Sequence, residues 1–144
     1  MKISTKGRYS LRMLLDLAEH RSQGFVSLKD VSKRQDISKK YLEQLVTLLN
    51  SPDILKTTRG NKGGYMLAKA PNQYTVGQIL EITEGGLSPV SCIEDDPNQC
   101  KRSSFCKTLP VWHGLEEVIN KYLYGITLED IMQNSKGAGT KELI

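Results

Sequence analysis

The sequence lacks the features of a membrane or exported protein. No apolar stretch approaches the roughly 18 residues that a membrane-spanning helix needs. The first ten residues, MKISTKGRYS, contain no apolar run either. We therefore expect no signal peptide, no membrane partner and a cytoplasmic location.

Motifs of common enzymes are also missing. The chain contains no phosphate-binding nucleotide loop, no HExxH and no GxSxG. Its two histidines, His20 and His113, have no evident catalytic partner in the sequence pattern. We therefore expect a protein that is not an enzyme.

Cysteine is scarce, and all of it lies in one segment, Ser91–Cys106, which reads SCIEDDPNQCKRSSFC. An odd count of three excludes a fully paired disulfide framework. A chain of this length and composition can bury a core without such crosslinks. The spacing is not CxxC, which disfavours a zinc ribbon or a thioredoxin-like pair. In a reducing compartment, clustered cysteines more often bind metal or sense redox state.

Positive charge is concentrated in the first half of the chain. Residues 1–70 hold 14 Lys and Arg against 6 Asp and Glu, a net charge of +8. Residues 71–144 hold 6 against 10, a net charge of −4. This asymmetry favours a polyanion-binding module joined to a second element, although scattered surface charge would look the same.

The first half has the pattern of a helix-turn-helix. Apolar residues recur every three or four positions over residues 4–20, which predicts a helix. Ser27 begins a short helix over about 28–34, residues 35–37 form a turn, and Ser38 begins a second helix that Pro52 ends. The second helix has a wide apolar face, for which we expect burial of Tyr41, Leu42, Leu45, Val46, Leu48 and Leu49.

A β-hairpin follows directly and predicts a wing. Residues 54–58 and 65–67 favour strands, and the RGNKGG turn between them places Arg59 and Lys62 at its tip. The glycines in this turn permit positive φ and a close approach of the backbone, notably at Gly63. The fold class we expect is mainly α with a small β-hairpin wing: a winged helix-turn-helix plus a long C-terminal helix.

The remaining residues predict three further elements. Thr75 begins a helix whose inward residues are Val76, Ile79, Leu80 and Ile82. A long helix with an extended apolar stripe runs to about residue 124, and a short helix covers TLEDIMQN. The expected organisation is a winged helix-turn-helix domain at 1–86, a cysteine-containing loop at 87–106, a long helix and a short helix at 107–134, and a flexible tail at 135–144.

This arrangement predicts a DNA interface. The second helix of a helix-turn-helix enters the major groove, and its first residues meet base edges. Gln suits adenine, Lys suits guanine or phosphate, and a wing arginine suits a narrow minor groove. Any one of these side chains could instead be ordinary helix surface, and Tyr41 could be core, but their order beside a wing favours DNA. The candidate DNA-binding residues are Ser38, Lys39, Lys40, Tyr41, Glu43, Gln44, Arg59, Lys62 and Gly63.

Three motifs carry a family resemblance: MKISTKGRY at the start, SxxYLEQL at 38–45, and RGxxGGYxL at 59–67. They resemble the bacterial winged-helix regulators that include IscR, NsrR and CymR. The resemblance implies a homodimeric transcription factor, which we expect to be a repressor, on a roughly palindromic DNA operator. It implies base contacts by Gln44, minor-groove entry by Arg59, and dimerisation through the long helix near 106–124.

The resemblance also implies that Cys92, Cys100 and Cys106 hold an iron–sulfur cluster, expected as [2Fe–2S]. Two features depart from the family pattern: the first cysteine spacing is longer, and Leu109 stands where the family has a histidine ligand. Arg8 stands where one branch has an acidic ligand. The candidates for a fourth ligand are His113 and the acidic residues of the loop. A structural zinc site, a thiol switch sensing thiol or cysteine status, and cysteines without a role remain open alternatives.

Overall fold

A computed structural model describes residues 1–134, and its architecture confirms the expected fold class. The helices are α1 (Thr5–Glu19), α2 (Leu28–Gln35), α3 (Lys39–Leu49), α4 (Val76–Glu84), α5 (Leu109–Tyr124) and α6 (Leu128–Asn134). One antiparallel hairpin joins β1 (Leu55–Thr58) to β2 (Gly64–Leu67). The tail predicted at 135–144 lies outside the described residues. None of the helices within 1–134 is both long enough and apolar enough to cross a membrane.

Hydroxyl side chains begin the first four α-helices. In each case the side-chain oxygen accepts a hydrogen bond from the backbone N–H three residues later, which satisfies a donor that the first helical turn leaves free. The capping residues are Ser4, Ser27, Ser38 and Thr75. The turn between α2 and α3 has the predicted three residues but lies one position later, at 36–38, because Gln35 still belongs to α2 and α3 begins at Lys39. Within this turn Asp36 adopts a left-handed conformation with φ of 53°.

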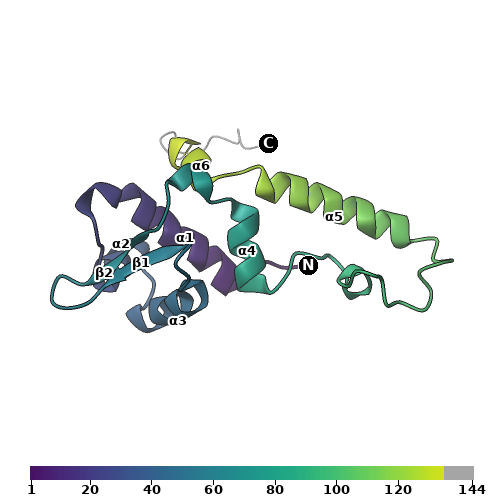
Figure 1. Cartoon of the computed structure of the whole chain (residues 1–144), viewed down its shortest axis with the longest axis horizontal. Coiled ribbons are helices and arrows are strands. Elements are labelled where there is room, and N and C mark those ends of the chain that lie inside the picture. Colours follow the sequence, from purple (N-terminus) through teal and green to yellow (C-terminus); the bar gives the residue numbers. More distant parts are fainter. Residues whose placement is uncertain (135–144) are drawn as a thin grey trace.

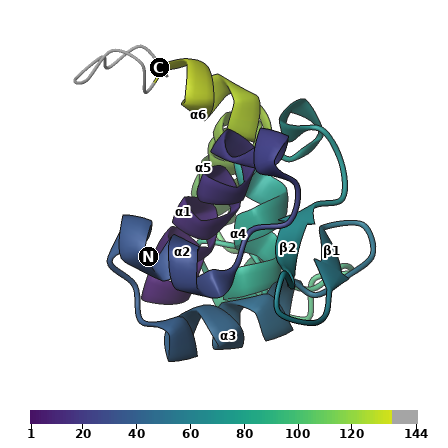
Figure 2. The ribbon, with the colours of Figure 1, turned by 90° about the vertical axis from the view of Figure 1, so that its left-hand side faces the viewer.

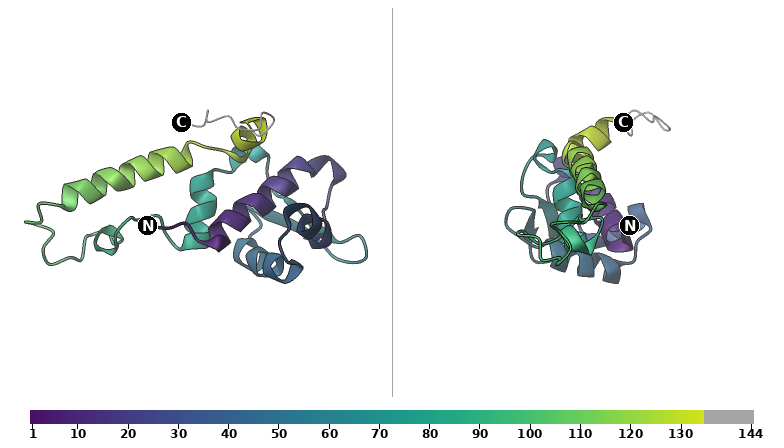
Figure 3. Two further views of the ribbon diagram at one scale, coloured as in Figure 1. Left: turned by 180° about the vertical axis from the view of Figure 1, so that it is seen from behind. Right: turned by 90° about the vertical axis from the view of Figure 1, so that its right-hand side faces the viewer.

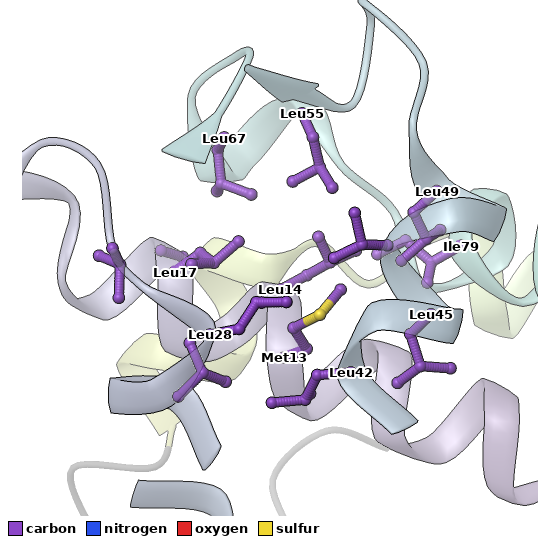
Figure 4. Packing of buried hydrophobic residues seen from close by; sticks show 14 of the residues in the cluster. Met13, Leu14, Leu17, Leu28, Leu42, Leu45, Leu49, Leu55, Leu67 and Ile79 are labelled. Atoms are coloured by element: carbon purple, nitrogen blue, oxygen red, sulfur yellow. The ribbon is translucent and has the colours of Figure 1, made fainter. Parts of the chain in front are cut away.

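The core forms around α1. Its apolar face carries Met13, Leu14 and Leu17, all at most 1% exposed, and packs against α2, α3, α4, α6 and β2. Leucines of α3 and the hairpin complete the same cluster (Figure 4). Burial of each such side chain stabilises the fold by about 1.5–3 kcal/mol relative to exposure. This packing holds α2 and α3 against α1.

Two expected core positions are wrong. Leu48 is 40% exposed and Ile82 is 39% exposed. Each helix buries residues at i, i+3, i+4 and i+7, which are Leu42, Leu45, Val46 and Leu49 in α3. At about 100° per residue, position i+6 points well away from that face. Both apolar side chains therefore lie on the flank of their helix.

The cysteine segment and α5 form an arm that leaves the body of the molecule (Figures 1 and 3). The chain runs outward after α4, passes a short 3₁₀ turn at Ser91–Ile93, and returns through α5. No residue of α5 is fully buried. The helix begins at Leu109 rather than near 106, and Pro110 occupies its first turn, where a missing N–H costs little.

The end of α5 is fixed to α4. The ring of Tyr124 lies against Gly77, where any β-carbon would collide with it. Its hydroxyl donates a hydrogen bond to the Glu81 carboxylate. Burial, together with this carboxylate, raises the pKa of Tyr124 to about 12. The junction anchors one end of the arm. Farther along α5, Glu116 accepts a hydrogen bond from Ser88 Oγ at 2.6 Å, which ties the helix to the segment that follows α4.

Candidate nucleic-acid interface and cysteine loop

The first turns of α3 present the predicted recognition residues together. Ser38 caps the helix by accepting the Tyr41 backbone N–H at 3.2 Å. Lys39, Lys40, Glu43 and Gln44 are exposed, because the apolar positions of α3 face the core. Neither lysine forms an ion pair within residues 1–134, so their charges are available to an anionic partner.

Tyr41 combines packing with exposure. The side chain is partly buried, and its ring meets the Tyr9 ring edge-on at a centroid distance of 5.7 Å. Such edge-to-face aromatic pairs contribute about 0.5–1.5 kcal/mol beyond their buried area. Tyr41 therefore ties α3 to α1 while remaining at the start of the recognition helix.

A buried ion pair holds α1 against α2. Asp16 is 1% exposed and accepts hydrogen bonds from the Arg34 guanidinium, with the shortest at 2.7 Å. Gln35 Nε2 donates to the same carboxylate at 3.0 Å. The carboxylate raises the pKa of Arg34 above its usual value. Sequence reasoning missed this pair, although an acidic residue among the apolar positions of α1 was a usable signal.

The hairpin stands beside α3, on the side of the body away from the free end of the arm (Figure 2). Leu55 pairs with Leu67 and Thr58 pairs with Gly64, which leaves Arg59 and Lys62 exposed at the tip. Two further backbone hydrogen bonds, of 2.9 and 2.8 Å, join Val26 to Tyr65 and anchor the hairpin to the segment before α2. The wing is therefore fixed at its base and charged at its tip.

The glycines of the RGxxGGY motif have steric causes. A β-carbon at Gly63 would lie 2.7 Å from the Thr58 carbonyl oxygen, and one at Gly64 would collide with the Val26 carbonyl. Real side chains essentially never approach so closely. The hairpin turn and its anchor therefore both require glycine at these positions.

The three cysteines are free thiols, and each is partly buried. Cys106 Sγ lies 3.3 Å from Thr108 Oγ1. Hydrogen bonding by this hydroxyl and by nearby backbone N–H groups lowers the pKa of Cys106. Cys100 accepts no such hydroxyl contact, but its backbone N–H donates to Asn98 Oδ1 at 2.8 Å. The lowered pKa favours the thiolate form of Cys106.

The donor chemistry of the loop suits a cluster, but the donors are not assembled. Three free thiols are the ligand type that holds iron–sulfur clusters. Within residues 1–134, however, no three Cys, His, Asp or Glu side chains come together in a way that could hold a metal ion. His113 is exposed on α5 and Leu109 begins that helix. The structure therefore leaves the predicted fourth ligand unassigned.

Comparison with known proteins gives a consistent match over nearly the whole chain. The family model "Rrf2: Iron-dependent Transcriptional regulator" matches residues 3–134. Protein rrf2 of Nitratidesulfovibrio vulgaris is 38% identical over 135 residues, covering 94% of this chain and 89% of the relative. The regulator CymR of Bacillus subtilis is 37% identical over 137 residues, covering 95% and 94% respectively. The regulator IscR of Pectobacterium carotovorum is 34% identical over 136 residues, covering 94% and 82%.

Solved structures agree with the sequence comparison. CymR of B. subtilis, described as a global cysteine regulator, superposes with a TM-score of 0.76 at 35% identity, covering 93% of this chain and 98% of that one. The structure described as T. potens IscR gives the same score and identity, covering 99% and 93%. Because the CymR and IscR relatives are transcriptional regulators, the expectation that the chain is not an enzyme is confirmed. The chain belongs to the Rrf2 family of transcriptional regulators.

Proposed function

We propose that this protein is a homodimeric repressor that binds a roughly palindromic operator in double-stranded DNA. The observation that carries this proposal is the exposed, unpaired row of Lys39, Lys40 and Gln44 beside a wing tipped by Arg59. In this assignment the start of α3 meets base edges in the major groove, and Arg59 enters the minor groove. A repressor acts on the chromosome, so the proposal implies a cytoplasmic protein.

Dimerisation through α5 is supported by its unpartnered apolar stripe. One face of α5 carries four apolar side chains, three aliphatic and one aromatic, that are between 41% and 65% exposed. They are Val111, Leu115, Val118 and Tyr122. Apolar residues repeated over several turns on an exposed helix face are typical of a helix–helix interface. A second copy of α5 would cover this stripe and set the separation of the two recognition helices.

The cysteine loop is proposed as the sensor. Cys92, Cys100 and Cys106 would hold a [2Fe–2S] cluster, with His113 as the first candidate for a fourth ligand. A bound cluster supplies a redox-active centre tied to the loop by thiolate bonds. The loop connects α4 of the DNA-binding domain to α5 of the dimer interface, so ligands drawn together there would alter how the two recognition helices are presented.

A second candidate is thiol sensing or zinc binding on the same loop. One observation favours thiol sensing: the Thr108 hydroxyl lies beside the Cys106 thiol, and its hydrogen bond lowers the pKa of Cys106. Thiolate character governs cysteine reactivity, so the lowered pKa makes Cys106 a candidate for reaction with oxidants. DNA binding is the same in both candidates, and only the signal differs.

One sample distinguishes the sensor candidates. Protein purified without oxygen is examined by visible absorbance, and iron, sulfide and zinc are assayed on the same preparation. Visible bands with iron and sulfide support the cluster, and His113→Ala then tests the fourth ligand. A colourless protein without iron and sulfide refutes the cluster and leaves zinc or thiol sensing.

The DNA assignment is tested with Gln44→Ala and Arg59→Ala. Each should lose about 1–3 kcal/mol of binding to a selected operator sequence. Gln133→Ala on α6 and Arg21→Ala beyond the end of α1 are controls of the same residue type, exposed and away from α3. If the Gln44 and Arg59 variants bind as tightly as their controls, the proposed interface is wrong.

A further inference from the structure

The sequence at the start of α1 forms a basic patch, and the carboxylate that lies beside it, Glu84 of α4, accepts hydrogen bonds from Ser4 Oγ at 2.7 Å and from the Ser4 backbone N–H at 3.0 Å. No acidic residue precedes Asp16, whereas Lys2, Lys6, Arg8 and Arg12 all lie in this stretch. From this patch we infer that Arg8 binds a backbone phosphate of duplex DNA, at the edge of the groove that α3 enters. The inference rests on the proposed DNA binding and adds a contact outside α3 and the wing.

An aromatic bridge places this patch next to α3. Tyr9 follows Arg8 directly, and its ring meets the Tyr41 ring at 5.7 Å. The guanidinium carbons of Arg8 and Arg12 lie 5.9 and 5.0 Å from the centroid of the Tyr9 ring. Arg8 is thus separated by only two aromatic rings from the first turn of the recognition helix.

Among residues 1–134, Arg8 differs from Arg12 and Arg34 in having most of its guanidinium donors available to a ligand. Arg34 is engaged by the Asp16 carboxylate at 2.7 Å. Arg12 donates to both the side-chain and the backbone oxygen of Gln35, at the end of α2. Arg8 is exposed, donates only to Thr5 Oγ1 at 3.1 Å, and has no carboxylate partner among residues 1–134. A guanidinium has five N–H donors, so most of those on Arg8 remain unused.

The chemistry of this site favours a phosphate. The planar guanidinium fork matches phosphate oxygens, and most protein–DNA hydrogen bonds position the protein on the sugar–phosphate backbone. The Tyr9 ring holds the cation beside α3, which limits the freedom that Arg8 would lose on binding. Arg12 acts differently: by joining Gln35 to the Tyr9 ring, it is a positioning residue that holds α1 at the α2–α3 turn.

A salt titration tests this contact without knowledge of the operator. Binding to an arbitrary duplex is measured by fluorescence anisotropy over a range of salt concentrations for wild type, Arg8→Ala, Arg8→Lys and the charge-matched control Arg21→Ala. A protein that contacts phosphates releases counterions when it binds, so log K decreases with log salt. For each contact that Arg8→Ala removes, this negative slope should become shallower by about 0.9. Arg8→Lys should keep most of the slope, and Arg21→Ala should match wild type.

Each other result has a defined meaning. An Arg8→Ala slope equal to that of wild type overturns the contact, and so does an equal loss in Arg21→Ala, which would reflect net charge alone. Unchanged thermal unfolding of Arg8→Ala is the folding control, as expected for an exposed side chain. A wild-type protein without salt-dependent duplex binding would refute the proposed DNA binding itself.

Discussion

Replacing Arg34 with alanine should destabilise the protein by isolating a buried charge. In the native structure Arg34 Nε and Nη2 donate to Asp16 at 2.7–3.2 Å, and Asp16 is 1% exposed. The Arg34 side chain is 31% exposed, so solvent reaches the guanidinium far more readily than the Asp16 carboxylate, which is 1% exposed. The variant leaves a carboxylate inside the contact between α1 and α2, with Gln35 as its remaining hydrogen-bond donor and His20 Nδ1 at 3.7 Å.

The expected loss in the free energy of unfolding follows from this difference in burial between Asp16 and Arg34. Breaking a buried ion pair by removing one partner costs about 3–5 kcal/mol. The remaining Gln35 hydrogen bond and the partial exposure of Arg34 favour the low end, about 3 kcal/mol. For a chain near this size, such a loss lowers Tm by roughly 6–12 °C. Asp16→Ala should cost less, because the Arg34 side chain it leaves can turn toward water.

Urea unfolding followed by circular dichroism measures both effects at one fixed protein concentration, since dimerisation would shift the midpoint. Lys33→Ala, an exposed cation on the same helix, is the matched control. The Asp16→Ala/Arg34→Ala double variant should recover about 1–3 kcal/mol relative to the sum of the single changes. The ion pair does not stabilise the fold as proposed if Arg34→Ala lowers the free energy of unfolding no more than Lys33→Ala does. The same holds if the loss in the double variant equals the sum of the losses in the two single variants.

Three further predictions concern the wing, the arm and the cysteine loop. Gly64→Ala should cost about 1–3 kcal/mol in urea unfolding because its β-carbon meets the Val26 carbonyl, whereas Gly114→Ala in open space should not destabilise. Val118→Asp should convert the dimer to monomer in sedimentation, and an unchanged dimer would contradict the role of α5. In the folded protein Cys106 should be alkylated at lower pH than in the urea-unfolded chain, because its lowered pKa gives more thiolate at a given pH. Thr108→Val, which removes the hydroxyl contact, should reduce this pH difference, as measured by mass-spectrometric peptide mapping.

The helix-turn-helix and wing could be predicted because their signals are local. Capping hydroxyls such as Ser38 lie next to the helix they begin, and apolar periodicity shows which face is buried. The error at Leu48 arose because a run of adjacent apolar residues looks wider than the face a helix can bury. Only the packing of α3 against α1 shows that this side chain lies on the flank.

Contacts between distant residues were beyond prediction. Asp16 and Arg34 are 18 residues apart, and nothing local indicates that they pair. The start of α5 at Leu109 depends on how the cysteine loop folds, which periodicity does not report. In the same way, the family resemblance implied that Cys92, Cys100 and Cys106 are cluster ligands, with His113 as a candidate for the fourth. A resemblance in sequence does not bring donors together, and the described residues do not show that set assembled.

The central claim is that the cysteine loop controls binding of DNA by α3 and the wing. The most direct test measures the Kd for a selected operator duplex before and after anaerobic reconstitution with iron and sulfide, for wild type and for a variant with Cys92, Cys100 and Cys106 changed to serine. The account predicts that reconstitution changes the Kd of wild type and leaves the Kd of the variant unchanged. Equal Kd values for both proteins under both conditions would contradict control of DNA binding by this loop through a cluster.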